Sequence, residues 1–155
     1  MNPRTDYDLK TSVERTFRRF LGGVLRKLGH SKAMTDSEVA KIGKSLLGDK
    51  FIGVFALDEI DYNTPRPTGT CYVMNNKTRR SNGEHWLAVW YNQNQTPVLF
   101  DSFARKHVIP DFQGEMTESD IDQQDWQDSC GQRCIAFLCS RDVRGCLLLG
   151  LIIRG

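Results

Sequence analysis

The sequence predicts an α+β domain preceded by a basic helical arm, on the basis of two observations. Apolar residues recur at helical spacing over residues 9–28 and 39–47, ahead of any strand pattern. Short apolar runs rich in β-branched and aromatic residues then follow between residues 51 and 101, bounded by turn residues. Helices that precede a group of strands are typical of the α+β class.

Length and composition suit one compact globular domain. The chain has 155 residues, of which 39% are hydrophobic and 26% are charged, unlike the composition of disordered chains. The longest apolar run, Cys146–Ile153, covers less than half of the roughly 20 residues that a membrane-spanning helix needs. Five cysteines without a C-x-x-C spacing indicate free thiols in a reducing compartment, and no secretory signal is recognisable. We therefore expect a protein that is not secreted and holds no structural zinc.

An amphipathic helix is predicted at the start of the chain. Gly29 ends it, and its apolar stripe consists of Leu9, Val13, Phe17, Phe20, Val24 and Leu28. Basic residues fall mostly away from that stripe: Arg15, Arg18, Arg19, Arg26 and Lys27. Residues 1–33 hold eight Lys and Arg against three Asp and Glu, a net charge of +5, whereas residues 34–155 hold thirteen against sixteen, a net charge of −3. We therefore divide the chain into a basic arm, residues 1–33, and a domain, residues 34–155.

Two interpretations of the arm remain open. Its basic side suits DNA or an acidic partner surface, with a membrane surface slightly less favoured. Alternatively, the apolar stripe packs on the domain and the arginines are simply solvated. The first interpretation predicts that deleting residues 1–33 leaves the chemistry of the domain nearly unchanged. The second predicts that the deletion lowers thermal stability and activity together.

A second helix and four strands are predicted next. Thr35-Asp-Ser-Glu38 forms a capping box ahead of a helix that Gly48 ends. Strands are predicted at 51–57, 70–74, 85–91 and 97–101, and the last two form a β-hairpin. Both faces of this hairpin are apolar, which is typical of central strands that are covered on both sides. Residues 104–129 are polar and lack a clear period, so we assign no element to them.

The hairpin brings a histidine close to a carboxylate. If its turn is centred near Gln93, Leu87 lies opposite Leu99 and His85 lies opposite Asp101. Opposed side chains on one sheet face have Cβ atoms roughly 4.5–5.5 Å apart, a distance from which a carboxylate can accept the imidazole N–H. The alternative is a hairpin end with two unrelated polar residues, and a slip of one residue would put them on opposite faces.

Cys130 adds a candidate nucleophile. The spacing of Cys134 and Phe137 predicts a helix that begins at or near Cys130. In the first turn of a helix, the macrodipole, the unpaired backbone N–H groups and a nearby imidazolium all stabilise a thiolate. The same N–H groups, together with the side-chain amide of Gln124, can donate to the oxyanion of a tetrahedral intermediate. The alternative role for Cys130 is that of a buried structural cysteine, the role we expect for Cys134 and Cys139.

Five stretches carry a resemblance to a known family: Phe51-Ile-Gly-Val-Phe55, Cys71-Tyr-Val-Met-Asn75, Gly83-Glu-His-Trp-Leu87, Leu99-Phe-Asp-Ser-Phe103 and Gln123-Gln-Asp-Trp-Gln-Asp-Ser-Cys-Gly131. Through them the chain resembles the adenovirus protease (adenain) and its relatives, which include the SUMO-specific proteases and the proteases of large self-synthesising virus-like transposons. The order histidine, aspartate, glutamine, cysteine is the order of that family.

The resemblance implies a papain-like core of the adenain type, with a central mixed sheet flanked by helices and the nucleophile at a helix N-terminus. It implies a cysteine endopeptidase that cleaves viral capsid or core precursors after small residues, often glycine, with no cofactor or metal. Cys130 would attack, His85 would take the thiol proton, Asp101 would orient the histidine and Gln124 would hold the oxyanion. Such a protein would work in the virion and in the host cell interior, either nucleus or cytoplasm.

Two other functions remain open. The chain could be a catalytically weak virion structural or binding protein that keeps the fold, or a protease that removes ubiquitin-like proteins. Trp126 and Gln127 stand where the SUMO-specific proteases usually carry Asn-Gly, which favours a viral substrate. The segment from Asp101 to Gln124 contains no cysteine, so the resemblance leaves open an activating peptide joined by a disulfide.

Overall fold

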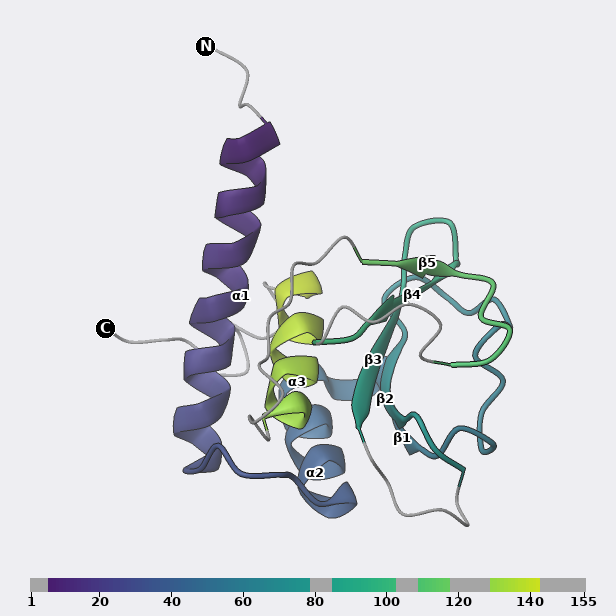
Figure 1. The fold of residues 1–155 in the computed structure, drawn as a ribbon, viewed down its shortest axis with the longest axis horizontal. Helices are drawn as coiled ribbons and strands as arrows, with labels where there is room; N and C mark the ends of the chain where they lie inside the picture. The colour runs from purple at the N-terminus through teal and green to yellow at the C-terminus, as the bar shows by residue number, and fades with distance from the viewer. Residues whose placement is uncertain (1–5, 79–84, 103–108, 118–128, 143–155) are drawn as a thin grey trace.

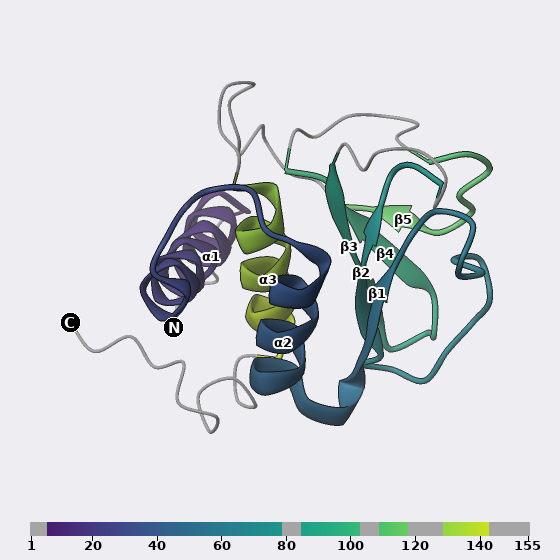
Figure 2. The same ribbon diagram turned by 90° about the horizontal axis from the view of Figure 1, so that it is seen from below.

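The computed structural model describes residues 6–78, 85–102, 109–117 and 129–142, and the side chains of residues 6–14 lie outside this description. Its elements follow in the order α1 (Asp6–Leu28), α2 (Asp36–Leu47), the 3₁₀ helix η1 (Gly48–Lys50), β1 (Phe51–Phe55), β2 (Cys71–Asn75), β3 (Trp86–Tyr91), β4 (Pro97–Phe100), β5 (Glu115–Met116) and α3 (Cys130–Arg141). The predicted α+β class is confirmed, and Figures 1 and 2 show the helices gathered on one side of the sheet.

The sheet is mixed and its strands lie in chain order, β1-β2-β3-β4-β5. β1 pairs with β2 and β4 pairs with β5 in parallel, while β3 is antiparallel to both β2 and β4. The sequence did not predict β5, which lies in the polar stretch without a period. Gly114 permits this pairing, because a Cβ atom at that position would lie 2.1 Å from the Pro97 carbonyl oxygen. A side chain there would therefore push β5 away from β4.

The hairpin between β3 and β4 has a different register from the predicted one. Val89 pairs with Leu99 and Tyr91 pairs with Pro97, so the turn is centred at Asn94 and the pairing is shifted by two residues. Asn92 produces the shift, because its backbone N–H bonds the Thr96 carbonyl at 3.0 Å and closes a loop of three residues. Gln95 adopts a left-handed φ of 60° in that loop, the conformation expected at the end of a three-residue hairpin turn.

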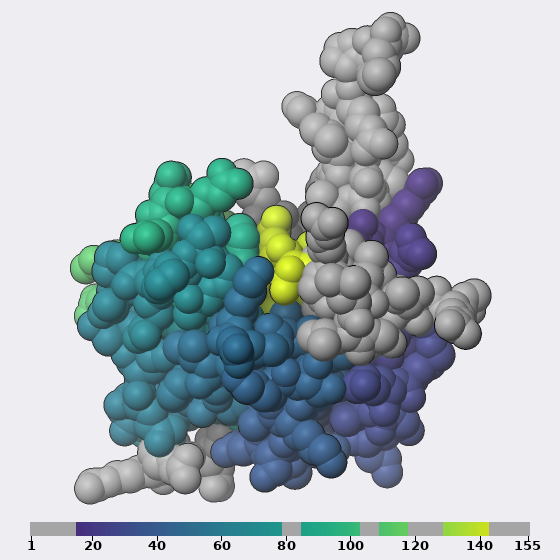
Figure 3. All heavy atoms as spheres, turned by 180° about the vertical axis from the view of Figure 1, so that it is seen from behind, coloured from purple at the N-terminus to yellow at the C-terminus, as the bar shows by residue number. Residues whose placement is uncertain are grey.

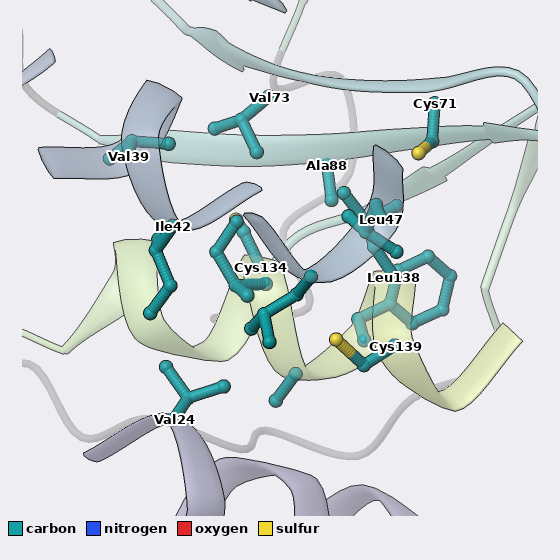
Figure 4. Close-up of a cluster of buried hydrophobic side chains, with 14 of the residues drawn as sticks. Val24, Val39, Ile42, Leu47, Cys71, Val73, Ala88, Cys134, Leu138 and Cys139 are labelled. Carbon is teal, nitrogen blue, oxygen red and sulfur yellow. The ribbon is translucent and has the colours of Figure 1, made fainter. Parts of the chain in front are cut away.

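Both faces of the sheet are covered, as the apolar hairpin predicts. On one face, the side chains of the helices and of alternate strand residues form the larger hydrophobic cluster, part of which Figure 4 shows. It includes Val24, Val39, Ile42, Val73, Ala88, Cys134 and Leu138. The opposite face carries Tyr72, Met74, Leu87, Val89, Tyr91 and Leu99, packed against Ile109 and the connection between β1 and β2. The strands around the candidate site are therefore held from both sides.

The first helix belongs to the larger cluster. Phe20 and Val24 are 3% and 0% exposed. The Phe17 ring lies 5.9 Å from the ring of Phe100 on β4, and Phe100 stacks on Phe137 of α3 at 4.6 Å. The core thus draws on residues from both sides of the division that we placed after residue 33. Deleting residues 1–33 would open this core, so the expectation that such a deletion spares the chemistry is replaced by an expected loss of stability.

Local signals in the sequence account for the helix ends. The Thr35 hydroxyl accepts the Glu38 backbone N–H at 3.2 Å, and the Glu38 carboxylate accepts the Thr35 N–H at 3.0 Å. This is the predicted capping box at the start of α2. Gly29 and Gly48, which follow α1 and α2, have left-handed φ angles of 84° and 64°. Within the part of the chain that is described, no helix has the length and apolar content needed to cross a membrane.

Candidate active site

His85 and Asp101 form a buried hydrogen-bonded pair at one end of the sheet. His85 immediately precedes β3 and Asp101 immediately follows β4. The His85 Nε2 and Asp101 Oδ1 atoms are 2.6 Å apart, and the two residues are 3% and 1% exposed. Continuing the observed register would set Asp101 opposite Leu87 rather than opposite His85. The predicted contact therefore exists although the predicted pairing was wrong, because a shift of two residues keeps both side chains on one face.

The surroundings of the imidazole favour its charged form. Burial lowers the pKa of His85, but the hydrogen bond to Asp101 and a hydrogen bond to the Cys130 side chain both raise it. The net effect is a pKa above the ordinary value of 6.5. Because Asp101 engages Nε2, Nδ1 is the ring nitrogen available to the thiol. The structure thus brings together three of the four predicted site residues.

Cys130 is the first residue of α3, as predicted. Its side chain is partly exposed, while most of the helix that follows is buried. Ser129 precedes the helix but does not cap it with its side chain. The Ser129 hydroxyl instead accepts from Arg133 Nε at 2.9 Å. The first N–H groups of a helix have no partner within that helix, so an anion beside Cys130 would meet them.

Gly131 allows the start of α3 to approach its neighbours closely. A Cβ atom at this position would lie 2.9 Å from Met34 Sδ and 3.2 Å from Trp86 Cδ1. Trp86 follows His85 directly in the chain, and its indole N–H donates to the Met34 carbonyl at 3.3 Å. The absence of a side chain at Gly131 therefore lets the helix of the thiol lie against the strand of the histidine.

The other described cysteines are in a different setting from Cys130. Cys71, Cys134 and Cys139 are all buried in the larger hydrophobic cluster, and Figure 4 labels them. Burial raises the pKa of the Cys134 thiol well above its ordinary value. The structural role expected for Cys134 and Cys139 therefore agrees with their positions. Cys130 alone among the described cysteines is partly exposed.

Gln124, the predicted oxyanion donor, lies outside the described residues, as do Trp126 and Gln127. Sequence reasoning missed two polar side chains at this site. The indole N–H of Trp86 was assigned no partner, and Gln132 was not considered at all. Gln132 is fully buried, and its Nε2 donates to the Lys32 carbonyl at 2.7 Å. Gln132 shares its side of the predicted helix with Ile135, Ala136 and Cys139, and a polar residue among these apolar ones was the available signal.

Comparison with known proteins assigns no family. The chain matches no protein-family model and no curated protein sequence. Among the described residues, no group of three or more His, Cys, Asp and Glu side chains is placed to hold a metal ion. The geometry of the Cys130, His85 and Asp101 side chains is therefore the feature from which a function can be inferred.

Proposed function

We propose that this protein is a cysteine endopeptidase of the adenain type, with Cys130 as its nucleophile. One observation carries the proposal: a partly exposed thiol at a helix start is hydrogen-bonded to a buried histidine, which is itself bonded to a buried aspartate. A nucleophile, a base and a residue that orients the base are the set that acyl transfer requires.

The chemistry proceeds in two steps. The Cys130 thiol gives its proton to His85 Nδ1, and the sulfur attacks the scissile carbonyl carbon to form a tetrahedral oxyanion. Collapse of this intermediate breaks the C–N bond, and the imidazolium donates the proton to the leaving amine. Water then gives a proton to His85 and attacks the thioester, which releases the acid product and the free thiol. Asp101 holds the ring and stabilises the imidazolium in both steps.

The oxyanion requires donors close to Cys130. Backbone N–H groups at the start of α3 are the described candidates, and Gln124 completes the proposed set. Substrates would be viral capsid or core precursors cleaved after small residues, in the virion or the host cell interior. The resemblance supports this substrate class, and incubation with candidate precursors beside fluorogenic ubiquitin-like substrates tests it. Cleavage of the ubiquitin-like substrates alone would move the protein to the deconjugating class.

Selective alkylation tests the proposed thiolate. At about pH 5.5, an ordinary thiol is only about one part in a thousand ionised and reacts slowly with iodoacetamide. We expect Cys130 of the native protein to be alkylated at this pH, because its sulfur is partly exposed at a helix start and hydrogen-bonded to His85. Cys134 should stay unlabelled, since it is fully buried and its pKa is raised. Peptide mapping by mass spectrometry identifies the labelled residue.

The His85→Ala variant is the control for this labelling. It keeps Cys130 at the helix start but removes the imidazolium, so the labelling at acidic pH should fall to that of an ordinary thiol. Equal labelling of Cys130 with and without His85 would contradict the proposed pair. It would favour a binding or structural protein that keeps the fold without the chemistry.

The basic side of α1 supports a second proposal, binding to DNA. Arg15, Arg18, Arg19, Arg26 and Lys27 are all exposed, and the described side chains of α1 form one edge of the molecule in Figure 3. Because this helix also contributes to the core, charge reversal is a cleaner test than deletion. Solvated arginines can be replaced without disturbing Phe20 or Val24.

We expect Arg18→Glu/Arg19→Glu to weaken DNA binding and to reduce its salt dependence. Each lost phosphate contact lowers the slope of log K against log salt by about 0.9. Fluorescence anisotropy over a salt series measures both quantities, and turnover of a short peptide should be unchanged. The matched control is Lys41→Glu/Lys44→Glu, which makes the same charge change on exposed positions of α2. Equal loss of affinity in both variants would show that only net charge matters.

A further inference from the structure

The segment that connects α1 to α2, residues 29–35 and here called the linker, passes the start of α3. Figure 1 shows it crossing from the end of α1 to α2 below Cys130's helix. The Met34 side chain is buried, 6% exposed, and touches the position of Gly131. His30 and Thr35 fix the two ends of the linker, because both bond the Glu38 carboxylate, at 2.8 and 3.0 Å.

Two hydrogen bonds tie the linker to the two sides of the candidate active site. Gln132, two residues after Cys130, donates from Nε2 to the Lys32 carbonyl at 2.7 Å. Trp86, the residue after His85, donates from its indole nitrogen to the Met34 carbonyl at 3.3 Å. The carbonyls of Lys32 and Met34, two residues apart in the linker, thus hold both sides of the site. One binds α3, which begins at Cys130, and the other binds β3, which follows His85.

Burying the Gln132 side chain costs free energy, and packing alone does not explain why a polar residue occupies this position. The residue is fully buried, and its Oε1 atom has no hydrogen-bond partner among the described residues. An apolar side chain of the same length would fill this space without a buried acceptor left unsatisfied. The bond to Lys32 therefore contributes a fixed position for the start of α3 more than it contributes stability.

We propose that the linker sets the separation between the Cys130 sulfur and the His85 imidazole, and that Gln132 and Trp86 are positioning residues for the reaction. This inference rests on the proposed peptidase function. The geometry between a nucleophile and its base has a steep effect on rate, and a misplacement of about 1 Å can cost roughly 100-fold. Neither residue needs to touch substrate, so substrate binding should be preserved.

Gln132→Met tests the inference because it keeps the length of the side chain and removes the amide N–H donor and C=O acceptor. We expect kcat to fall by about tenfold or more while KM changes less than about twofold, since only the reacting groups are displaced. The rate of Cys130 alkylation at about pH 5.5 should fall as well, because the sulfur would be displaced from the His85 imidazole. Ser140→Ala is the control: it removes the Ser140 hydroxyl bond to the Phe137 carbonyl at the far end of the same helix.

Trp86→Phe supplies a second variant, which removes the indole N–H but keeps an aromatic ring. We expect the same pattern, and we expect the double variant to lose less than the product of the two single losses, because both bonds act through one linker. The inference is overturned if both variants keep the wild-type kcat and alkylation rate, or if Ser140→Ala loses as much kcat as they do. Failure of the proposed function is a separate result. In that case the wild-type protein hydrolyses no substrate, while the alkylation of Cys130 still measures how Gln132 and Trp86 affect the pair of Cys130 and His85.

Discussion

Cys130→Ala is expected to abolish peptide hydrolysis while the protein stays folded. Removing the nucleophile of a well-studied peptidase lowers kcat on the order of 10⁶-fold, because no covalent intermediate can form. Cys130 is partly exposed at the first residue of α3, so a methyl group in place of the thiol leaves little cavity. Activity is measured with the purified chain and a glycine-containing peptide or precursor, and folding is measured by thermal unfolding.

Cys134→Ala is the matched control, one turn further along the same helix. Cys134 is fully buried in the larger cluster, so this variant should lose roughly 1 kcal/mol of stability and keep its turnover. The two variants thus have opposite profiles, one inactive and stable, the other active and less stable. Normal turnover by the Cys130 variant would remove the proposed mechanism.

His85→Ala should be nearly as damaging to turnover and more damaging to stability. It removes the imidazole that contacts the buried Asp101 carboxylate, and breaking a buried pair in this way typically costs about 3–5 kcal/mol. Asp101→Asn should be milder, because an amide oxygen can still accept the Nε2–H and keep Nδ1 free to take the thiol proton. We therefore expect kcat to decrease in the order wild type, Asp101→Asn, His85→Ala, measured on one peptide.

The same pair predicts a dependence of stability on pH. The folded-state pKa of His85 is above its ordinary value of 6.5, so the protonated ring stabilises the folded protein. This contribution is complete below that ordinary value and is lost as the pH rises through the raised folded-state pKa. The Asp101→Asn variant lacks the carboxylate that contributes most to raising the pKa of His85. The change of unfolding free energy with pH should therefore be smaller in this variant. Urea unfolding at a series of pH values measures it, and an identical dependence in both proteins would assign it to other groups.

The sequence predicted the contact between His85 and Asp101 more reliably than the contacts around it. Successive side chains of a strand point to opposite faces of the sheet, so an error of two residues in register keeps His85 and Asp101 on one face and leaves their contact intact. The turn itself was misplaced because the left-handed φ of Gln95 comes from the Asn92 side chain and from loop closure, which no periodicity records.

Contacts between distant segments were beyond prediction for a similar reason. The bond from Trp86 to Met34 joins residues 52 positions apart, and the bond from Gln132 to Lys32 joins residues 100 positions apart. Apolar spacing identifies the buried side of a helix but does not say which loop lies against it. β5 escaped notice because a strand of two residues has no measurable alternation, and only the close approach at Gly114 makes it pair.

The position of α3 between α1 and the sheet affects how the protein folds during its synthesis. α1 is translated first among the described elements and α3 last, and Figure 2 shows α3 lying between α1 and the sheet. Phe17 and Phe20 of α1 therefore reach their packed positions in the larger cluster only when α3 is present. The apolar stripe of α1 therefore stays exposed on the growing chain until α3, which ends at Arg141, has left the ribosome. Contacts of such long sequence separation slow folding and leave an aggregation-prone intermediate with exposed apolar surface. The proposed nucleophile belongs to the same helix, so a chain that has not yet reached α3 lacks Cys130 and, under the proposed mechanism, cannot cleave the proteins made beside it.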